Sequence, residues 1–566
     1  MNAFLNKFIT FHSLIRGIIF LTCFFGTMTA VFHSGFFVPH DFTHAARIAE
    51  MNRSLLSGEF PVRWSQNFGF GYGMPLFNFY APLPYYVAQI PYMLGLGAVN
   101  SIKFLYILSA LFAFFSMYLF SSVWWGKKGG LVSAIVFSFS TYRALDLYVR
   151  GDIGEVWAMS LLPFVLFGIT QLIRGKKWGG LITCVSLAAV LLSHNLTGLI
   201  CLPFVGVFAI VVALIEHRIF LVAFKRLVTS LLILIFGIGL SGFYIIPGFF
   251  EKQFTRVAQT ITVGYFDFHN HVLIVRQLLF GKWGYGASYP YPYSGLSFVI
   301  GIGTLFLVGL AVIGLLKATS KQRLFFVLCA CLCGLTTFMS LNKSIWIWEH
   351  IDVLKYMQFP WRFLLFSHVF IALLAGGSVF VRKIHPFLFL FVLLGLGIML
   401  VQQSKDFTPE KFVTDSQAQQ VYYTDPISIQ AQMSKTLNDY LPPSIVGNEL
   451  LPLQENRLVI EKGKGEISFV KNVPSDIVAA AACEDTCVLQ VNLFQFPGWR
   501  AIIDGKSQHL SQNSSFPIYS LTVSKGNHLI EVRLQNTPIR EVSNIISLGS
   551  VSCLVLYCFW MRKRKV

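Results

Sequence analysis

Long apolar runs recur along most of this chain and are separated by short polar segments. A helix needs roughly 20 apolar residues to cross a bilayer, and runs of that length with little charge are typical of membrane spans. We count twelve such runs and expect each to be a transmembrane helix. They cover residues 14–36, 101–123, 129–147, 153–173, 179–194, 197–216, 226–247, 294–316, 324–341, 362–381, 385–402 and 542–560.

The pattern changes between the last two runs. Residues 403–541 begin with polar, Gln-rich sequence and continue with short segments in which apolar and polar residues alternate, as in half-buried strands. The segments that predict strands are 458–460, 466–470, 487–491 and 528–532. Asp504–Gly505 follows an apolar segment and predicts a tight hairpin. We therefore predict three parts: a multi-span domain at 1–402, a β-sandwich at 403–541, and a C-terminal span with a basic tail at 542–566.

Composition supports a polytopic α-helical membrane protein. Hydrophobic residues make up 55% of the chain and charged residues only 12%, against about 25% charged in soluble domains. The first run has no small-residue cleavage site, so we expect it to be retained as a signal anchor. Eight of the ten cysteines fall inside predicted spans, where they are expected to pack as small apolar residues. Cys483 and Cys487 lie in the predicted sandwich, where a local disulfide and two free thiols both stay open. A zinc site is less favoured, because two cysteines without a nearby histidine make an incomplete ligand set.

The formal net charge of +18 gathers in short clusters between the spans. Basic clusters mark cytoplasmic loops. With the N-terminus inside and twelve spans, every cluster falls on the cytoplasmic side, provided that the proline-interrupted segment 82–97 does not cross. The segments 37–100, 143–153, 248–293 and 403–541 then lie on the outer face. Orientation and contact with anionic membrane lipids account for the charge, so nucleic acid is not an expected partner.

The first candidate site follows the first span. Asp41 stands where the chain leaves the lipid, and an ionisable residue in such a place is a functional hypothesis by default. His44 is three residues away, which predicts a shared helical face. Arg47, Arg53 and Arg63 add cations, and Trp64 adds an aromatic ring, at the same depth. The Gly/aromatic run 68–73 offers backbone that a ligand can approach closely. Two structural alternatives stay open: Asp41 as a helix N-cap, and the 68–73 run as an ordinary interfacial loop.

The second candidate site opens the fourth predicted span. Asp152 and Glu155 share a face at the N-terminal end of that helix, where carboxylates favour the helix dipole. That structural role is one explanation. The other is that Arg150 binds a phosphate while Asp152 or Glu155 supports catalysis or binds a cation.

Two further residues lie at the same predicted level. His194 ends the fifth span, and a buried histidine satisfied by a helix-end carbonyl is the more frequent explanation for such a residue. Arg362 opens the tenth span from outside, where it can snorkel to the interface or grip an anionic head group. The sequence shows no phosphate-loop, serine-nucleophile-elbow, zinc-protease or dinucleotide motif, so a recognisable ATP site is not expected.

Taken together, the motifs resemble a known group of bacterial membrane proteins. They are His40–Asp41–Phe42–Thr43–His44, Pro61-x-Arg63–Trp64, Gly71–Pro75 through Tyr80–Leu83, Arg150–Glu155, Ser193–Asn195 and Gln358–Arg362. The group is named for a "6-pyruvoyl-tetrahydropterin synthase-related" domain, and the resemblance covers about two-thirds of the chain. Residues 496–506 are similar to the C-terminal domain of a related group linked to cell-envelope glycosylation. The soluble pterin enzyme needs a three-histidine zinc site, and this chain has no comparable set of histidines.

The resemblance implies a GT-C-type glycosyltransferase of the bacterial cytoplasmic membrane. Such enzymes carry an acidic residue in the first outer loop and use polyprenyl-phosphate sugars; Asp41 matches that acidic position. The implied reaction is an inverting transfer of the sugar to an envelope glycan or protein acceptor on the outer face. In it Asp41 is the general base, supported by Asp152 and Glu155. The substrate-binding residues that we predict are His44, Arg63, Arg150, His194 and Arg362.

No cofactor is expected, although Asp41 is a single acidic residue rather than a pair, and this leaves a divalent cation open. Two other classes of function stay open as well. A flippase or transporter of lipid-linked glycans predicts ionisable residues midway along the spans, and these spans carry few charges. A non-catalytic scaffold would use the β-sandwich to bind envelope glycan.

Overall fold

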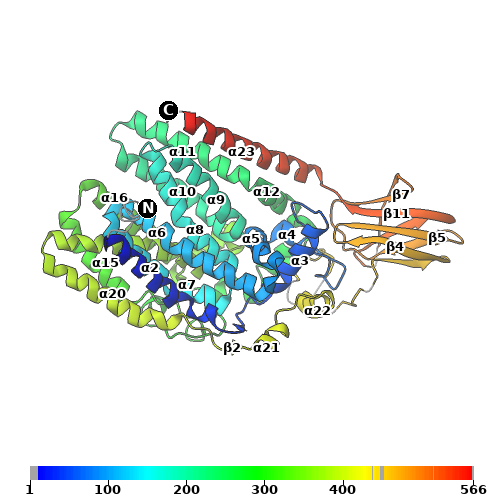
Figure 1. The fold of residues 1–566 in the computed structure, drawn as a ribbon, viewed down its shortest axis with the longest axis horizontal. Helices are drawn as coiled ribbons and strands as arrows, with labels where there is room; N and C mark the ends of the chain where they lie inside the picture. The colour runs from blue at the N-terminus through cyan, green and yellow to red at the C-terminus, as the bar shows by residue number, and fades with distance from the viewer. Residues whose placement is uncertain (1–10, 436–437, 446–450, 455, 514–515, 564–566) are drawn as a thin grey trace, which may run out of the picture.

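The computed structural model describes residues 11–435, 438–445, 451–454, 456–513 and 516–563. Figure 1 shows two parts: a bundle of helices and, at one end of it, a β-sandwich. The principal helices of the bundle are α2 (Phe11–Met28), α5 (Leu83–Pro91), α6 (Gly97–Ser138), α8 (Ile153–Ile173), α9 (Trp178–Ser193), α10 (Asn195–Glu216), α11 (Phe220–Leu240), α12 (Gly242–Glu251), α15 (Ile302–Gly314), α16 (Ser320–Met339), α19 (Leu364–Gly376), α20 (Phe389–Gln403) and α23 (Pro538–Lys563). Short helices α3 (His44–Leu56), α4 (Leu76–Phe79), α7 (Thr141–Ala144), α13 (Val257–Thr260), α14 (Val275–Leu279), α17 (Ile345–His350), α18 (Asp352–Lys355), α21 (Asp415–Gln419) and α22 (Pro426–Gln432) complete it.

Within the described residues, nine helices are long and apolar enough to cross a membrane, so the chain is a multi-pass membrane protein. The predicted count of twelve is not confirmed. The predicted span 101–123 and part of the span 129–147 fall in one helical stretch, Leu83–Ser138. This stretch departs from helical geometry at Gly95 (φ 82°) and at Gly126 (φ 73°), which lies beside Lys127–Lys128. Two others, Trp178–Ser193 and Ile302–Lys317, are apolar but shorter.

The centre of the bundle is built from two almost entirely buried segments, α8 and residues 360–383. Helix α8 packs against α6, α9 and α10, and α19 packs against α6 and α16. Both segments begin at the same end of the bundle, α8 just after Asp152 and the second segment with Trp361 and Arg362. The rigid centre of the fold therefore positions the residues that the sequence analysis singled out.

The predicted β-sandwich is present. A four-stranded sheet has the order β3-β6-β10-β9 and a five-stranded sheet the order β4-β5-β11-β7-β8, with antiparallel neighbours throughout. The strands are β3 (Leu458–Lys462), β4 (Gly465–Val473), β5 (Asp476–Cys483), β6 (Cys487–Val491), β7 (Trp499–Ile503), β8 (Lys506–Gln508), β9 (Ser511–Gln512), β10 (Tyr519–Val523) and β11 (Gly526–Leu534). Asp504 (φ 50°) and Gly505 (φ 77°) form the predicted tight turn between β7 and β8. The left-handed conformation of both residues suits a two-residue hairpin.

The sandwich begins later than the predicted boundary at 403. Residues 415–432 form α21 and α22, and β2 (Phe412–Val413) pairs with β1 (Phe36–Phe37) next to the first span. All ten cysteines are free thiols, including the buried Cys483 and Cys487, so the structure has no disulfide there.

The first loop contacts two other segments predicted for the outer face, 248–293 and 403–541, at one end of the bundle. His40 donates from Nε2 to the Tyr285 carbonyl at 2.9 Å, Arg53 donates to the Thr424 carbonyl, and the N–H of Phe494 donates to the Tyr72 carbonyl at 3.2 Å. In Figure 1, α3, α4 and α22 accordingly lie between the bundle and the sandwich. The loops therefore build one continuous region at this end.

Candidate functional site

The two candidate sites of the sequence are one site in the structure. The N–H groups of His40 and Asp41 donate to the carbonyls of Val149 and Arg150 at 2.9 and 2.8 Å. Gly151 adopts the left-handed conformation (φ 70°), and a Cβ there would lie 2.4 Å from Pro39. Glycine is therefore required for the close approach that brings Asp41 beside the 149–152 turn.

Asp41 is not the N-cap of α3. Thr43 holds that position and makes no side-chain capping bond, so the capping alternative is wrong. No described residue donates a hydrogen bond to the Asp41 carboxylate. Burial and the negative charge of Asp152 raise its pKa, and three nearby arginines offset this only in part. Asp41 is thus a carboxylate with free lone pairs and an affinity for protons above the ordinary value, both of which suit a general base.

The three arginines are Arg47, Arg150 and Arg362. Arg150 is saturated by acidic partners: its guanidinium pairs with Asp146, with Asp152 at 3.0 Å and with Glu155 at 2.9 Å. It also lies 4.7 Å from the centre of the Trp361 ring. Arg150, which the sequence predicted to bind a phosphate, therefore already has anionic partners within the protein.

Arg362 is held in a similar way. Its Nε lies 3.3 Å from a Glu155 oxygen, and its Nη1 donates to the Met357 carbonyl and to Gln358 Oε1, each at 2.9 Å. We call Asp146, Arg150, Asp152, Glu155 and Arg362 the paired cluster.

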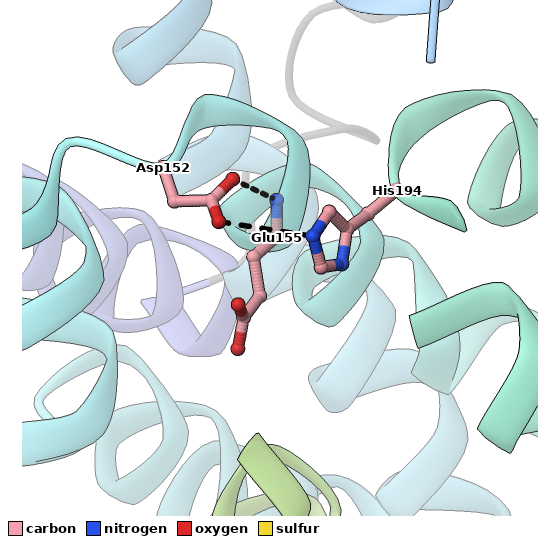
Figure 2. Close-up of side chains that lie close together, drawn as sticks. All are labelled: Asp152, Glu155 and His194. Atoms are coloured by element: carbon pink, nitrogen blue, oxygen red, sulfur yellow. Dashed lines mark hydrogen bonds and ion pairs between the residues drawn. The ribbon is translucent and has the colours of Figure 1, made fainter. Parts of the chain in front are cut away.

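Asp152 and His194 both cap helices. Asp152 accepts from the Glu155 N–H at 3.0 Å at the start of α8, and His194 Nδ1 accepts from the Thr197 N–H at 3.3 Å at the start of α10. Figure 2 shows the Asp152 carboxylate between these two helix starts, with His194 Nε2 at 3.7 Å. Burial lowers the pKa of His194, so the neutral ring accepts at Nδ1 and carries its proton on Nε2, toward Asp152. The structural role predicted for Asp152 at the start of α8 is thus realised. His194 also has a structural role, but it accepts from a backbone N–H and does not bond to the predicted helix-end carbonyl.

Asp152, Glu155 and His194 also form a possible metal-binding set, since their ligand atoms lie within 4.8 Å of one another (Figure 2). Two carboxylates and an imidazole suit several divalent ions. However, both carboxylates already pair with arginines, and the imidazole nitrogen nearest them carries a proton. The donor set therefore does not fit a resident cation unless these pairs break.

His44 links α3 to the 149–152 turn. Its Nε2 lies 2.8 Å from the Gly151 carbonyl and its Nδ1 2.8 Å from the Tyr85 hydroxyl. Burial and the positive charge of Arg47 lower the pKa of His44 to about 3. A neutral imidazole with both nitrogens hydrogen-bonded holds the loop in place and does not carry a charge to a ligand.

Arg63 lies apart from this group. Its Nη1 donates to Asn78 at 2.8 Å, and its Nη2 donates to the Phe243 carbonyl at 3.1 Å and to Asn544 at 3.3 Å. These partners belong to α4, α12 and α23, so Arg63 ties the first loop to the bundle near the sandwich.

Sequence reasoning left Arg47 out of the substrate-binding set, although the structure places it beside Asp41. It lies one turn after His44 on α3, a spacing that predicts the same helical face. Its aromatic neighbours Tyr80 and Tyr85 come from another part of the first loop and from α5. Nothing in the local sequence pattern indicates these contacts.

The fold and the site together define a multi-pass membrane protein with a charged site at the end of its bundle, where the β-sandwich is attached. No protein-family model matches the chain, so the family suggested by the short motifs is not confirmed. A curated protein from Lactococcus lactis subsp. cremoris (strain MG1363), described as an uncharacterized protein, is 25% identical over 228 residues. The match covers 38% of this chain and 36% of that relative, so the chain spans about a third of the relative's length.

Three solved structures are similar in part. Arabinofuranosyltransferase AftD from Mycobacteria has a TM-score of 0.45 and 12% identity, over 70% of this chain and 27% of that one. ArnT from Cupriavidus metallidurans bound to undecaprenyl phosphate has a TM-score of 0.39 and 14% identity, over 69% and 63%. The Archaeoglobus fulgidus oligosaccharyltransferase, in complex with Zn and sulfate, has a TM-score of 0.39 and 13% identity, over 70% and 53%. These values do not assign an activity to this chain, and the functional argument therefore rests on the site.

Proposed function

We propose that this protein is a membrane glycosyltransferase that transfers a sugar from a polyprenyl-phosphate donor to an envelope acceptor. The observation that carries the proposal is the state of Asp41. Its carboxylate accepts no hydrogen bond from the described residues, it has a raised pKa, and three arginines lie close enough to act on it. A free base beside cationic groups is what sugar transfer from a phosphate donor requires.

In the proposed reaction, Asp41 removes the proton from an acceptor hydroxyl as its oxygen attacks the anomeric carbon of the donor sugar. The bond from that carbon to the phosphate oxygen breaks, and the electron pair leaves with the lipid phosphate. The products are the glycosylated acceptor, with inverted configuration, and the polyprenyl phosphate. Positive groups stabilise the charge that develops on the departing phosphate.

In this proposal the side chains of the paired cluster hold one another in position and do not take part in the reaction. Asp152 and Glu155 hold Arg150 and Arg362 in place. The two guanidinium groups are then fixed in position near Asp41 and partly offset the negative charge of Asp152 there. Preorganised charges of this kind need no rearrangement during the reaction.

The location of the charges favours an enzyme over a transporter. Asp152 precedes α8, and Glu155 and Arg362 stand in the first turns of the two central segments, whereas a transport path predicts ionisable groups midway along spans. We further propose that the site faces the outer side of the bacterial cytoplasmic membrane, with the prenyl chain in lipid between helices. No metal is required for the proposed steps.

The test uses purified protein in lipid nanodiscs with a panel of polyprenyl-phosphate sugars and short glycan acceptors. We expect transfer by the parent protein and about 10²- to 10⁴-fold slower transfer by Asp41→Asn, the usual loss when a general base is removed. Binding of polyprenyl phosphate should persist in the variant. Normal transfer by Asp41→Asn would overturn the assignment of the base, and a parent protein that binds no polyprenyl phosphate would overturn the proposed substrate.

A further inference from the structure

Arg47 differs from the other arginines near Asp41 because its charge has no anionic partner. Its residue exposure is only 3%. Among the described residues, no carboxylate forms an ion pair with its guanidinium within 4.0 Å. A charge removed from water is costly unless an opposite charge or strong hydrogen bonds replace the water.

The contacts that Arg47 makes are with aromatic residues. Its guanidinium carbon lies 3.8 Å from the centre of the Tyr80 ring, and its Nη1 donates to the Tyr85 hydroxyl at 3.1 Å. Its Nε is buried and has no hydrogen-bond partner. One edge of the planar guanidinium, formed by Nε and Nη2, is therefore not used by any described residue.

A chain of hydrogen bonds fixes the direction of this edge. The Gly151 carbonyl can only accept, so His44 donates from Nε2 and accepts at Nδ1 from the Tyr85 hydroxyl. The Tyr85 oxygen in turn accepts from Arg47. The turn that carries Arg150 is thus connected through two side chains to Arg47, and the guanidinium is held in one orientation before any ligand binds.

A planar guanidinium with two free donors on one edge matches a phosphate group, which accepts two parallel hydrogen bonds. We propose that Arg47, oriented by Tyr85 and lying on the Tyr80 ring, is the residue that binds the phosphate of the lipid-linked donor. This inference rests on the proposed function and changes the sequence-based assignment, which gave that role to Arg150 and Arg362. The phosphate supplies the direct ion pair that no described carboxylate forms with Arg47, because Asp41 acts on Arg47 only from beyond ion-pair distance.

Arg47→Gln tests the assignment, with polyprenyl phosphate as the probe so that the sugar need not be known. Binding is measured in nanodiscs for the parent and the variant. We expect the affinity to fall about tenfold or more, because a charge-assisted bidentate contact is lost. Arg53→Gln is the matched control. Arg53 lies on the same helix as Arg47, but its guanidinium pairs with Glu50 at 2.6 Å. The affinity of this variant for polyprenyl phosphate should equal that of the parent.

Further variants separate charge from geometry. Arg47→Lys keeps the charge but loses the planar fork, and Tyr85→Phe keeps the ring but loses the bond that orients Arg47; each should weaken binding less than Arg47→Gln. Thermal unfolding without ligand shows whether each variant is folded. Because no described carboxylate forms an ion pair with Arg47, Arg47→Gln should unfold at the same temperature as the parent or higher, and a strong loss of stability would overturn the inference.

Probe chemistry identifies the source of the phosphate. A neutral polyprenol of equal length should bind the parent and Arg47→Gln alike, whereas inorganic phosphate and vesicles of anionic phospholipid should not compete with polyprenyl phosphate. Competition by either would show a general anion site and overturn the assignment to the donor. If Arg47→Gln binds polyprenyl phosphate normally, the inference fails while the proposed function stands. A parent protein that does not bind the lipid ends both.

Discussion

Two groups of charges lie side by side at this site, and they are satisfied in opposite ways. In the paired cluster, Arg150 has three carboxylate partners and Arg362 shares one of them. The second group, which we call the open group, consists of Asp41 and Arg47. Neither of these two side chains forms an ion pair with a described residue, although Arg47 is buried and Asp41 only partly exposed.

This difference separates charges that stabilise the protein from charges that await a ligand. The side chains of the paired cluster are one another's partners, so removing one of them leaves the others without an ion pair. The open group gains its partners only from a substrate, with an acceptor hydroxyl at Asp41 and a phosphate at Arg47 in our proposal. Functional sites commonly carry such unsatisfied groups at some cost in stability.

Among the substitutions that test this difference, Arg150→Gln should change the free energy of unfolding most. This change leaves the carboxylates of Asp146, Asp152 and Glu155 buried without their common partner, and we expect a loss of about 3–5 kcal/mol in the free energy of unfolding. Chemical unfolding in detergent measures it. The control is Arg533→Gln on the sandwich, where a side chain that is 45% exposed pairs with Asp476 and Glu531. An exposed pair contributes about 0–1 kcal/mol, and equal losses in both variants would contradict the distinction.

A smaller effect on the free energy of unfolding should distinguish Asp152 from Asp41 through its dependence on pH. Burial alone raises the pKa of Asp152, but His194 and the nearby arginines lower it below its ordinary value. Asp152 therefore stabilises the fold at neutral pH, and this contribution is lost as the pH falls through the lowered pKa. We expect Asp152→Asn to be less stable than the parent by about 1–3 kcal/mol at pH 7, with the gap closing in acid.

The contribution of Asp41 to stability should depend on pH in the opposite direction. Its folded-state pKa is raised above the ordinary value of 3.8, so the folded protein binds the proton more tightly than the unfolded chain does. The stability contributed by Asp41 then falls as the pH rises through this window. Asp41→Asn should accordingly be as stable as the parent at pH 7, or more stable, in the same unfolding measurement. A loss as large as that of Asp152→Asn would place Asp41 in the paired cluster.

The smallest effect on the protein itself is expected from two labelling variants that test orientation. Ser524→Cys on the sandwich and Lys176→Cys in the loop before α9 both replace exposed residues. In a background in which the exposed Cys331 and Cys553 are replaced by serine, the first should react with an impermeant thiol reagent in intact cells. The second should react only after the membrane is opened. The reverse pattern would place the Asp41 site on the cytoplasmic side.

Local patterns predicted the elements well because they depend on nearby residues. The predicted segments 458–460, 466–470, 487–491 and 528–532 lie within β3, β4, β6 and β11, and Asp504–Gly505 forms the expected turn, whereas β5 and β10 were not predicted. Length alone was a poorer guide to the number of spans, since the predicted spans 101–123 and 129–147 share one helical stretch, Leu83–Ser138, that is interrupted only by local departures at glycines such as Gly95 and Gly126.

The site could be predicted only in part. Asp41, Arg150, Asp152 and Glu155 were found because charges are rare in this chain, and positions beside span ends single them out. Their pairing could not be predicted, since which carboxylate satisfies which arginine depends on tertiary contacts between residues as distant as Glu155 and Arg362. For the same reason the predicted substrate-binding set contained Arg63 and omitted Arg47. In the structure Arg47 forms no ion pair with a described residue, whereas Arg63 is bound to α12 and α23.

The central claim is that Asp41 takes a proton during transfer of a sugar from a lipid phosphate. A strain that lacks this protein can be complemented with the parent or with Asp41→Asn, produced at equal levels in the membrane, and its envelope glycans compared by mass spectrometry. We predict that deletion removes one sugar from an envelope glycan, that the parent restores it, and that Asp41→Asn does not. Restoration by Asp41→Asn, or a deletion strain whose glycans match those of its parent, would contradict the account.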